Sequence, residues 1–384
     1  MFYELILYTP MFVTFFWAVT LLLTPKSKNI AKFFLGIFML AAFLVYFSHA
    51  VFFHGEKSFY LYIDPIYTFG SLMVYPLYFV YIKLLSIDTE FKKQNWFLFL
   101  PAILISGVTF ILYFIMTDIE RSEYIDTVFF NTKKLEKATF IQKTQHIVYI
   151  IGRFLFAIQV FCFLIKGSKL IKTYNTRIAN FYGDIEDKTI NWVNLLLWSF
   201  VITSIMSIAF NLIGKHYFYH STLLLLIPST IFSVLLFMIG FEGSMQNHTI
   251  TELLIDEEKE TQHQTNTSDE LLKERLIECF EKDKIYHHQN LKITDISSLL
   301  NTNRTYISNV INNDFKVSFS DFVNTYRIDE AKTLLKSKSA SKYTLEYIAE
   351  KVGFSSAHSF IRVFKKLVGK TPSTYKTIVK SLSN

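Results

Sequence analysis

Seven long apolar stretches fill most of the first 241 residues of this 384-residue chain and restrict what it can fold into. Each is about as long as the roughly 20 residues that a helix needs to cross a hydrocarbon core of about 30 Å. The apolar residues cover all sides of each expected helix, which argues against the core of a large soluble protein. The sequence therefore predicts seven transmembrane helices. They run over about 2–23, 30–53, 66–85, 96–116, 147–165, 192–213 and 221–241.

The positive charges between these stretches predict their orientation. Lysine and arginine gather in the first, third and fifth loops, whereas the second and sixth loops hold one lysine each, Lys57 and Lys215. The fourth loop mixes bases with acids. We therefore expect the N-terminus outside and, after seven crossings, the C-terminus in the cytoplasm. No positive region precedes the first apolar stretch, so a retained helix is expected there rather than a cleaved signal peptide.

Signatures of catalysis or of bound cofactors are not found in the sequence. Cys162 and Cys279 are the only cysteines, too few and too far apart for a metal site. Gly183-Asp184 and the glycines around Phe241 are interpreted as loop and helix-end residues rather than a phosphate cradle. We expect no enzyme activity, no metal and no cofactor.

The charge of the chain changes sign after Phe241. Residues 242–270 hold eight acidic residues against one base, Lys259, which predicts a solvated connector. From Ile285 to the end there are fifteen basic and seven acidic residues, a net charge of +8. A basic part of this kind favours binding to nucleic acid phosphates over a merely solvated or lipid-attracted surface.

Two helix-turn-helix patterns lie in this basic part. In the second, Thr344 caps a helix, Gly353 makes the tight turn, and a basic helix follows with Ser355 as the expected N-cap and Gly369 at its end. In the first, a helix that Thr294 can cap leads to the turn Asn301-Thr302. Asn303 then caps the next helix, and the long amphipathic helix over about 318–338 separates the two units.

Residues 285–376 resemble the DNA-binding domain of the AraC/XylS family of transcription regulators. The segments NLKITDISSLL, SFSDFVNTYRIDEAKTLL and GFSSAHSFIRVFKKLVGKTPSTYK fall in the order of that family. The resemblance implies an all-α domain that binds duplex DNA. One departure is Lys316, where relatives usually carry a glycine, so the backbone there must tolerate positive φ or the helix must end differently.

The outward faces of the second helix of each unit supply the candidate DNA contacts, since the N-terminal half of that helix enters the major groove. Asparagine suits adenine, arginine suits guanine, and methyl groups suit thymine. Ala357 and Ile361 are apolar where relatives often carry polar residues, so packing is an open alternative for Ile361. The base-reading candidates are Thr305, Ser308, Asn309, Asn312, Ala357, His358, Ile361 and Arg362. The phosphate candidates are Lys316, Lys365, Lys366 and Lys370.

Two residues within the apolar stretches are candidates for sensing a signal. Arg153 is a charge inside the fifth stretch, and such charges usually mark functional sites. Its alternative role is to extend towards the membrane interface. His49 lies in the second stretch, where a hydrogen bond between helices is the alternative to a ligand contact.

The sequence thus predicts an all-α protein in three parts. Residues 1–241 form a seven-helix transmembrane sensor domain, 242–267 an acidic connector, and 268–384 an AraC-type DNA-binding domain with units at about 294–312 and 344–368. We expect the signal to act through the connector, as the only covalent route between sensor and reader.

The expected function is that of a membrane-bound one-component transcription factor in the bacterial inner (cytoplasmic) membrane. The DNA-binding domain would lie in the cytoplasm. Its expected partners are double-stranded DNA, the lipid bilayer and an unknown small-molecule or membrane signal, with a homodimer and RNA polymerase left open. The alternatives are a transporter or membrane enzyme with a regulatory DNA-binding tail, and a lipid-regulated scaffold without preference for any duplex sequence.

Overall fold

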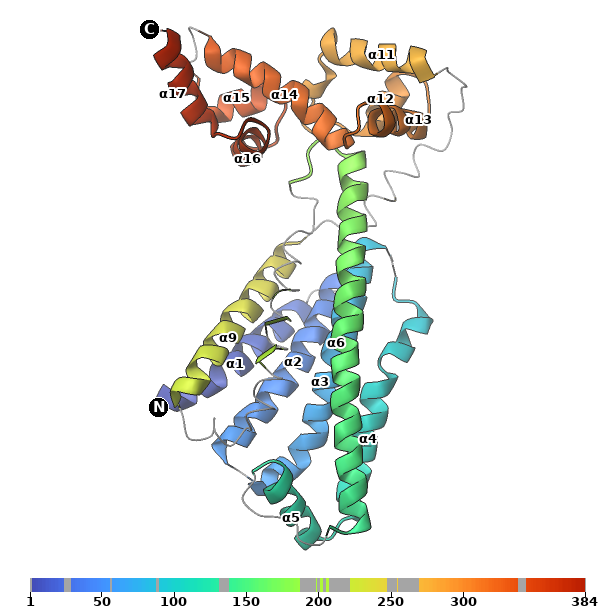
Figure 1. Ribbon diagram of the computed structural model, residues 1–384, viewed down its shortest axis with the longest axis vertical. Helices are drawn as coiled ribbons and strands as arrows, with labels where there is room; N and C mark the ends of the chain where they lie inside the picture. Colours follow the sequence, from blue (N-terminus) through green and yellow to red (C-terminus); the bar gives the residue numbers. More distant parts are fainter. Residues whose placement is uncertain are drawn as a thin grey trace. The chain divides into compact units, whose positions relative to one another are not determined.

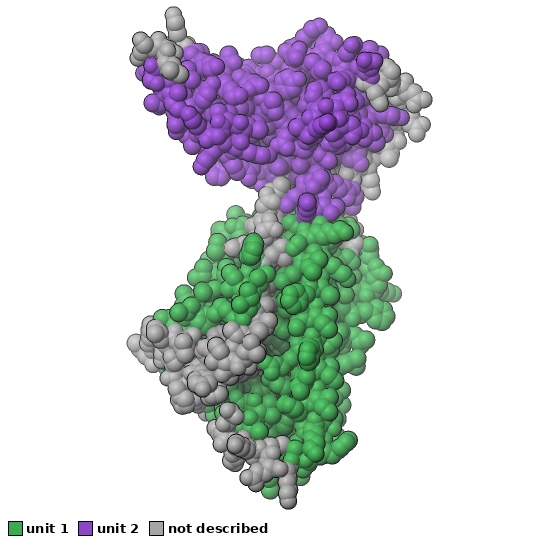
Figure 2. All heavy atoms as spheres, viewed as in Figure 1, with its two compact units in different colours: residues 1–171, 190–250 green, residues 172–189, 251–384 purple. Residues whose placement is uncertain are grey.

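A computed structural model describes most of the chain, and its described residues form helices and short connections (Figure 1). The chain divides into two compact units (Figure 2): unit 1 comprises residues 1–171 and 190–250, and unit 2 comprises 172–189 and 251–384. The predicted all-α class is confirmed. The described residues are 2–23, 29–55, 57–87, 90–130, 138–186, 198, 201–202, 205–206, 222–246, 254, 269–337 and 343–383.

Unit 1 is a bundle in which neighbouring helices along the chain pack together. Helix α1 packs on α2 and α9, α2 packs on α3, and α3 packs on α4. The α1–α9 contact is close, because a Cβ placed on Gly240 would lie 2.2 Å from the Trp17 ring. Small residues allow such approaches between helices. The helices of unit 1 are α1 (Phe2–Leu22), α2 (Ile30–His54), α3 (Lys57–Ser86), α4 (Leu100–Ile115), α5 (Asp118–Val128), the first part of α6 (Phe140–Phe181) and α9 (Thr222–Met245).

Five described helices are long and apolar enough to cross a membrane: 3–22, 30–54, 59–86, 140–181 and 225–245. They coincide with five of the seven predicted stretches. The fourth predicted stretch is shorter than expected: its α-helix, α4, has 16 residues, since a 3-10 helix (Lys93–Leu98) precedes it and Pro101 stands at its start. Proline favours the first turn of a helix, so α4 begins there. The sixth stretch, 192–213, lies almost wholly outside the described residues.

Unit 2 consists of two lobes joined by the long helix α14 (Phe319–Lys336). In the first lobe, α13 (Arg304–Asn309) packs on α11 (Asp269–Glu281) and α12 (Ile293–Leu299), and the Phe280 ring of α11 contacts the Phe322 ring of α14. In the second lobe, α15 (Leu345–Lys351), α16 (Ala357–Val368) and α17 (Pro372–Ser383) contact α14. The expected apolar stripe of α11 is present, as Leu272, Leu276 and Phe280 are fully buried.

Local signals fix the ends of the two helix pairs. The Asn303 and Thr344 side chains cap α13 and α15 as predicted, and Gly369 ends α16 in the left-handed conformation. The N-cap of α16 is Ser356 rather than the expected Ser355, because the Ser356 hydroxyl accepts from the Ser359 N–H. The N-cap position of α12 is Lys292, not Thr294, which lies within the helix.

Lys316 shows how the first helix-turn-helix unit ends without a glycine. Its φ is +56°, which is the first of the two alternatives that the sequence left open at this place. After α13 the chain continues through a π-helical turn, Val310–Asp314, before it reaches Lys316. The helix thus runs on by one wider turn, and the lysine adopts the conformation that a glycine would adopt more easily.

Unit 2 also takes in a segment that the sequence analysis placed in the fifth loop of the membrane domain. Helix α6 runs without a break across the division at 171 and ends at Phe181, and residues 182–186 follow it inside unit 2. The acidic connector, by contrast, lies outside the described residues apart from the end of α9 and Leu254. Its boundaries stay a prediction.

Candidate nucleic-acid interface and sensor cavity

Helix α13 and the π-helical turn after it carry the base-reading candidates of the first helix-turn-helix unit. Ile307, Val310 and Ile311 are buried, so the opposite side of the helix faces outward. Thr305 and Asn309 are exposed on that side. Ser308 and Asn312 are half-buried, and the Asn312 amide donates to the Ser308 hydroxyl at 3.0 Å. The structure therefore brings all four candidates to one region, with two of them already paired to each other.

Helix α16 carries the base-reading candidates of the second helix-turn-helix unit. Phe360 and Phe364 are fully buried, which turns His358 and Arg362 outward. Ala357 is half-buried, and Ile361 is half-buried and packs against the apolar core of the second lobe. Ile361 therefore packs on the core, which is the alternative that the sequence left open, while part of its side chain stays accessible.

The four phosphate candidates are all exposed. Lys316 follows the π-helical turn, Lys365 and Lys366 lie in the last turn of α16, and Lys370 follows its C-cap glycine. Lys366 donates to Asp321 of α14 at 2.8 Å. Exposed ion pairs of this kind contribute about 0–1 kcal/mol, so Lys366 can exchange its carboxylate for a phosphate at small cost.

Acidic side chains outside the predicted set lie against α16. Asp184 accepts from the Ser355 hydroxyl at 2.5 Å and from the Ser359 hydroxyl at 3.2 Å. Glu186 lies 3.7 Å from His358 and 4.0 Å from Arg362, measured between its Oε1 and their nitrogens. Sequence patterns could not reveal these contacts, since they join positions about 170 residues apart in the chain. Helical periodicity reports only on neighbours within an element.

Arg327 of α14 joins the two lobes. It is fully buried and donates to the carbonyls of Tyr286 and His288, both at 2.8 Å, while its guanidinium lies 5.3 Å from the centre of the Phe354 ring. Burial lowers the pKa of Arg327 to about 10, and the Asp184 carboxylate opposes that effect. The side chain is therefore charged at neutral pH. It holds the first lobe to the turn of the second helix-turn-helix unit.

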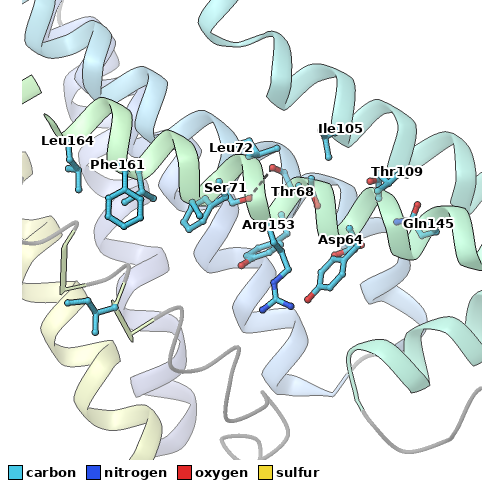
Figure 3. A pocket seen from close by; sticks show the side chains of 18 of the residues that line it. Asp64, Thr68, Ser71, Leu72, Ile105, Thr109, Gln145, Arg153, Phe161 and Leu164 are labelled. Carbon is cyan, nitrogen blue, oxygen red and sulfur yellow. Dashed lines mark hydrogen bonds between the residues drawn. The ribbon is translucent and has the colours of Figure 1, made fainter. Parts of the chain in front are cut away.

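Unit 1 contains a cavity of about 390 Å³ between α3, α4 and α6. Figure 3 shows Phe161 and Leu164 at one end, Thr109 and Gln145 at the other, and Arg153 between them. Buried polar groups line the polar end, since Asp64 is 2% and Gln145 1% exposed. The Gln145 Oε1 atom has no hydrogen-bond partner among the described residues. The cavity is thus amphipathic, with a cation in its middle.

The two sensor candidates differ in their relation to this cavity. Arg153 lines it and lies 5.2 Å from the centre of the Tyr149 ring. His49 does not line it, but its ring contacts the ring of Tyr67, a lining residue, at 5.3 Å between centres. Within the described part of the chain, no cluster of three or more His, Cys, Asp or Glu side chains could hold a metal ion.

Comparison with known proteins identifies the class of unit 2. Residues 296–378 match the family described as helix-turn-helix domain, and this part of the chain is a helix-turn-helix domain of the AraC type. No solved structure is a significant match to the chain.

Three relatives illustrate the match. The uncharacterized HTH-type transcriptional regulators YtdP and YfiF of Bacillus subtilis are 34% identical over 101 residues and 35% identical over 115 residues. The matches cover 26% and 30% of this chain but 13% and 34% of those relatives. The uncharacterized HTH-type transcriptional regulator SAS0078 of Staphylococcus aureus is 32% identical over 93 residues, which are 24% of this chain and 12% of the relative.

Proposed function

We propose that the chain is a membrane-bound one-component transcription factor that reads duplex DNA with α13 and α16. The carrying observation is that unit 2 holds two capped helix pairs on one central helix, each with polar side chains on its outward face. The helix-turn-helix match and the net charge of +8 from Ile285 onwards support DNA as the partner. Five apolar helices of spanning length support the membrane location.

Arg362 and Lys366 test this function, because they are expected to contact different parts of DNA. The target duplex is first selected from a random library with the full-length protein in detergent. Arg362→Ala should then weaken binding to that duplex by about 1–3 kcal/mol and relax the preference at one base pair. Lys366→Ala should weaken binding to every duplex and reduce the slope of log K against log salt by about one unit. Equal losses on selected and random DNA for both variants would contradict the assigned roles.

We further propose that the signal binds in the cavity of unit 1 and is an amphiphile with an anionic group. Arg153 would bind that group, the apolar body would lie along Phe156, Phe161 and Leu164, and a hydrogen-bond donor would satisfy Gln145. Sites of about this volume, mostly apolar with a few placed polar groups, are typical of small-molecule binding.

Three probes of equal chain length test the ligand class: decanoate, decanol and decylamine. Decanoate should raise the Tm of unit 1 in the full-length protein most, since it alone offers a carboxylate to Arg153. Arg153→Gln should remove this advantage, whereas Lys166→Gln, which removes an exposed charge outside the cavity on the same helix, should keep it. An equal rise in Tm with decylamine would contradict the anionic class. Uptake of the probe into vesicles would instead favour the transporter alternative.

A further inference from the structure

The chain after α6 is built into unit 2 through its backbone. Tyr182 pairs with Lys292 in an antiparallel bridge, and the Gly183 N–H donates to the Leu291 carbonyl at 2.8 Å. The Ser320 hydroxyl donates to the Gly183 carbonyl at 3.0 Å. A Cβ on Gly183 would lie 3.2 Å from the Leu291 oxygen, so this close pairing favours glycine. Residues 182–183 are therefore fixed on the first lobe and on α14.

Asp184 then anchors the chain at the start of α16. Its carboxylate accepts from the hydroxyls of Ser355 and Ser359 and from the Ser355 N–H at 3.3 Å. The residue is only 9% exposed. Burial raises the pKa of this carboxyl, but the hydrogen bonds from Ser355 and Glu186 and the charge of Arg327 outweigh it and hold the pKa below its usual value. Asp184 is thus a buried carboxylate with a full set of donors.

Glu186 places a second carboxylate on the outward face of α16. The Ser356 hydroxyl donates to it at 3.2 Å, and the side chains of His358 and Arg362 lie next to its other oxygen. The Glu186 side chain is 15% exposed, whereas His358 is 85% and Arg362 48% exposed. An acid therefore covers part of the face that presents two of the candidate base readers.

We propose that residues 182–186 are a built-in inhibitory segment, which must leave α16 before that helix can read DNA. This inference rests on the proposed function, since it assumes that His358 and Arg362 face the major groove. Glu186 lies 4.0 Å from a guanidinium nitrogen of Arg362, a group that would bond a base or phosphate, and a carboxylate at a DNA surface repels phosphates. Docking of the segment and docking of DNA therefore compete.

The contacts of Glu186 and Asp184 are expected to hold the segment on α16 with different strengths. Glu186 forms a long, partly exposed ion pair with Arg362, which is weak, so loss of its charge should tighten DNA binding by a few-fold only. Asp184 is the stronger anchor, because its carboxylate is buried and accepts from both Ser355 and Ser359. A signal that withdraws the whole segment should therefore have a larger effect than loss of the Glu186 charge.

Helix α6 provides the link to a signal. The cavity of unit 1 is lined by α6 from Gln145 to Leu164, and the same unbroken helix ends at Phe181, directly before the segment. Phe181 is buried in unit 2, where the Arg304 guanidinium lies 5.6 Å from the centre of its ring. A ligand that shifts α6 in the cavity would therefore act on the helix that leads directly into residues 182–186.

The first test measures affinity with the full-length protein and a duplex selected by it. Glu186→Gln should tighten binding by about three- to fivefold, because the charge pair with Arg362 disappears. The matched control is Glu350→Gln, which removes an exposed acid from α15 in the same domain and should change affinity less than twofold. Equal effects of the two variants would overturn the inhibitory segment. Failure of the wild type to prefer the selected duplex over a scrambled one would instead overturn the proposed function on which it rests.

The second test follows the segment itself. Cys162 and Cys279 are replaced by serine, and Ile185→Cys then reports on exposure of the segment through its rate of maleimide labelling. Ile185 is half-buried while the segment lies on α16, so selected DNA should speed labelling several-fold. The effect should be lost when Arg362→Ala is added. Unchanged or slower labelling on DNA binding would show that the segment stays on α16 and would overturn the proposal.

Discussion

The contacts that Arg327 of α14 makes can be made only by an arginine side chain. Two of its nitrogens bond the carbonyls of the short connection before α12, while its face meets Phe354 in the second lobe. Lysine could supply the charge but not two donors in a plane together with a flat surface for the ring. The Arg327 side chain therefore contacts both lobes and holds them together on α14.

Replacing this residue should loosen unit 2. Arg327→Met keeps the apolar volume but leaves the buried Tyr286 carbonyl without its donor, while the His288 carbonyl keeps the Leu291 N–H, so the free energy of unfolding of unit 2 should fall by about 1–3 kcal/mol. Hydrogen–deuterium exchange of the α14 and α15 amides in the full-length protein would measure it. Lys336→Met, at an exposed position of the same helix, is the control and should leave the exchange rates nearly unchanged. Equal exchange in both variants would refute the joining role of Arg327.

Two glycines lie in the turns before and after α16, with different surroundings. Gly353 has φ +94°, and a Cβ there would lie 2.3 Å from the Tyr286 carbonyl oxygen. Gly369 has φ +78° and open space around it. The first position combines backbone strain with a clash against fixed backbone, and the second has backbone strain alone.

Alanine at the two positions should separate these effects. Gly369→Ala should destabilise unit 2 by about 1 kcal/mol, the usual cost of a left-handed alanine. Gly353→Ala should cost clearly more and should also weaken DNA binding, because the turn sets the position of α16 on α15. Denaturant dependence of hydrogen exchange in α16 gives both values. A similar loss for the two variants would mean that the Tyr286 contact can shift freely.

Local patterns predicted the helices of unit 2 well, and long-range contacts were beyond them. The caps Asn303 and Thr344 and the helix-ending glycine Gly369 all follow from neighbours in the chain. The contact of Asp184 with Ser355 does not, because a Gly-Asp pair after a helix is typical of any loop. The short α4 was also missed, since apolar length alone does not show where Pro101 starts a helix.

The whole chain is expected to have one orientation in the membrane, set by its lysines and arginines. A reporter fused after Phe241 should be cytoplasmic, and one placed between Asp118 and Lys143 should be exterior. In the described residues the latter region begins with α5, whose first turn carries Asp118 and Glu120. Activity of a cytoplasmic and a periplasmic reporter enzyme at each site measures this. Both sites on one side would rule out the three crossings predicted between Lys143 and Phe241, and with them the seven-helix arrangement.

The contact between α1 and α9 has a consequence for how the protein is made. The Ser229 hydroxyl donates to the Ile6 carbonyl across 223 positions, and Gly240 meets Trp17 in the same pair of helices. At about 5–20 residues per second, a ribosome takes roughly 10–45 s to span that interval. During this time the side of α1 that will pack on α9 lacks that partner, so the contact between these two helices can form only late in synthesis.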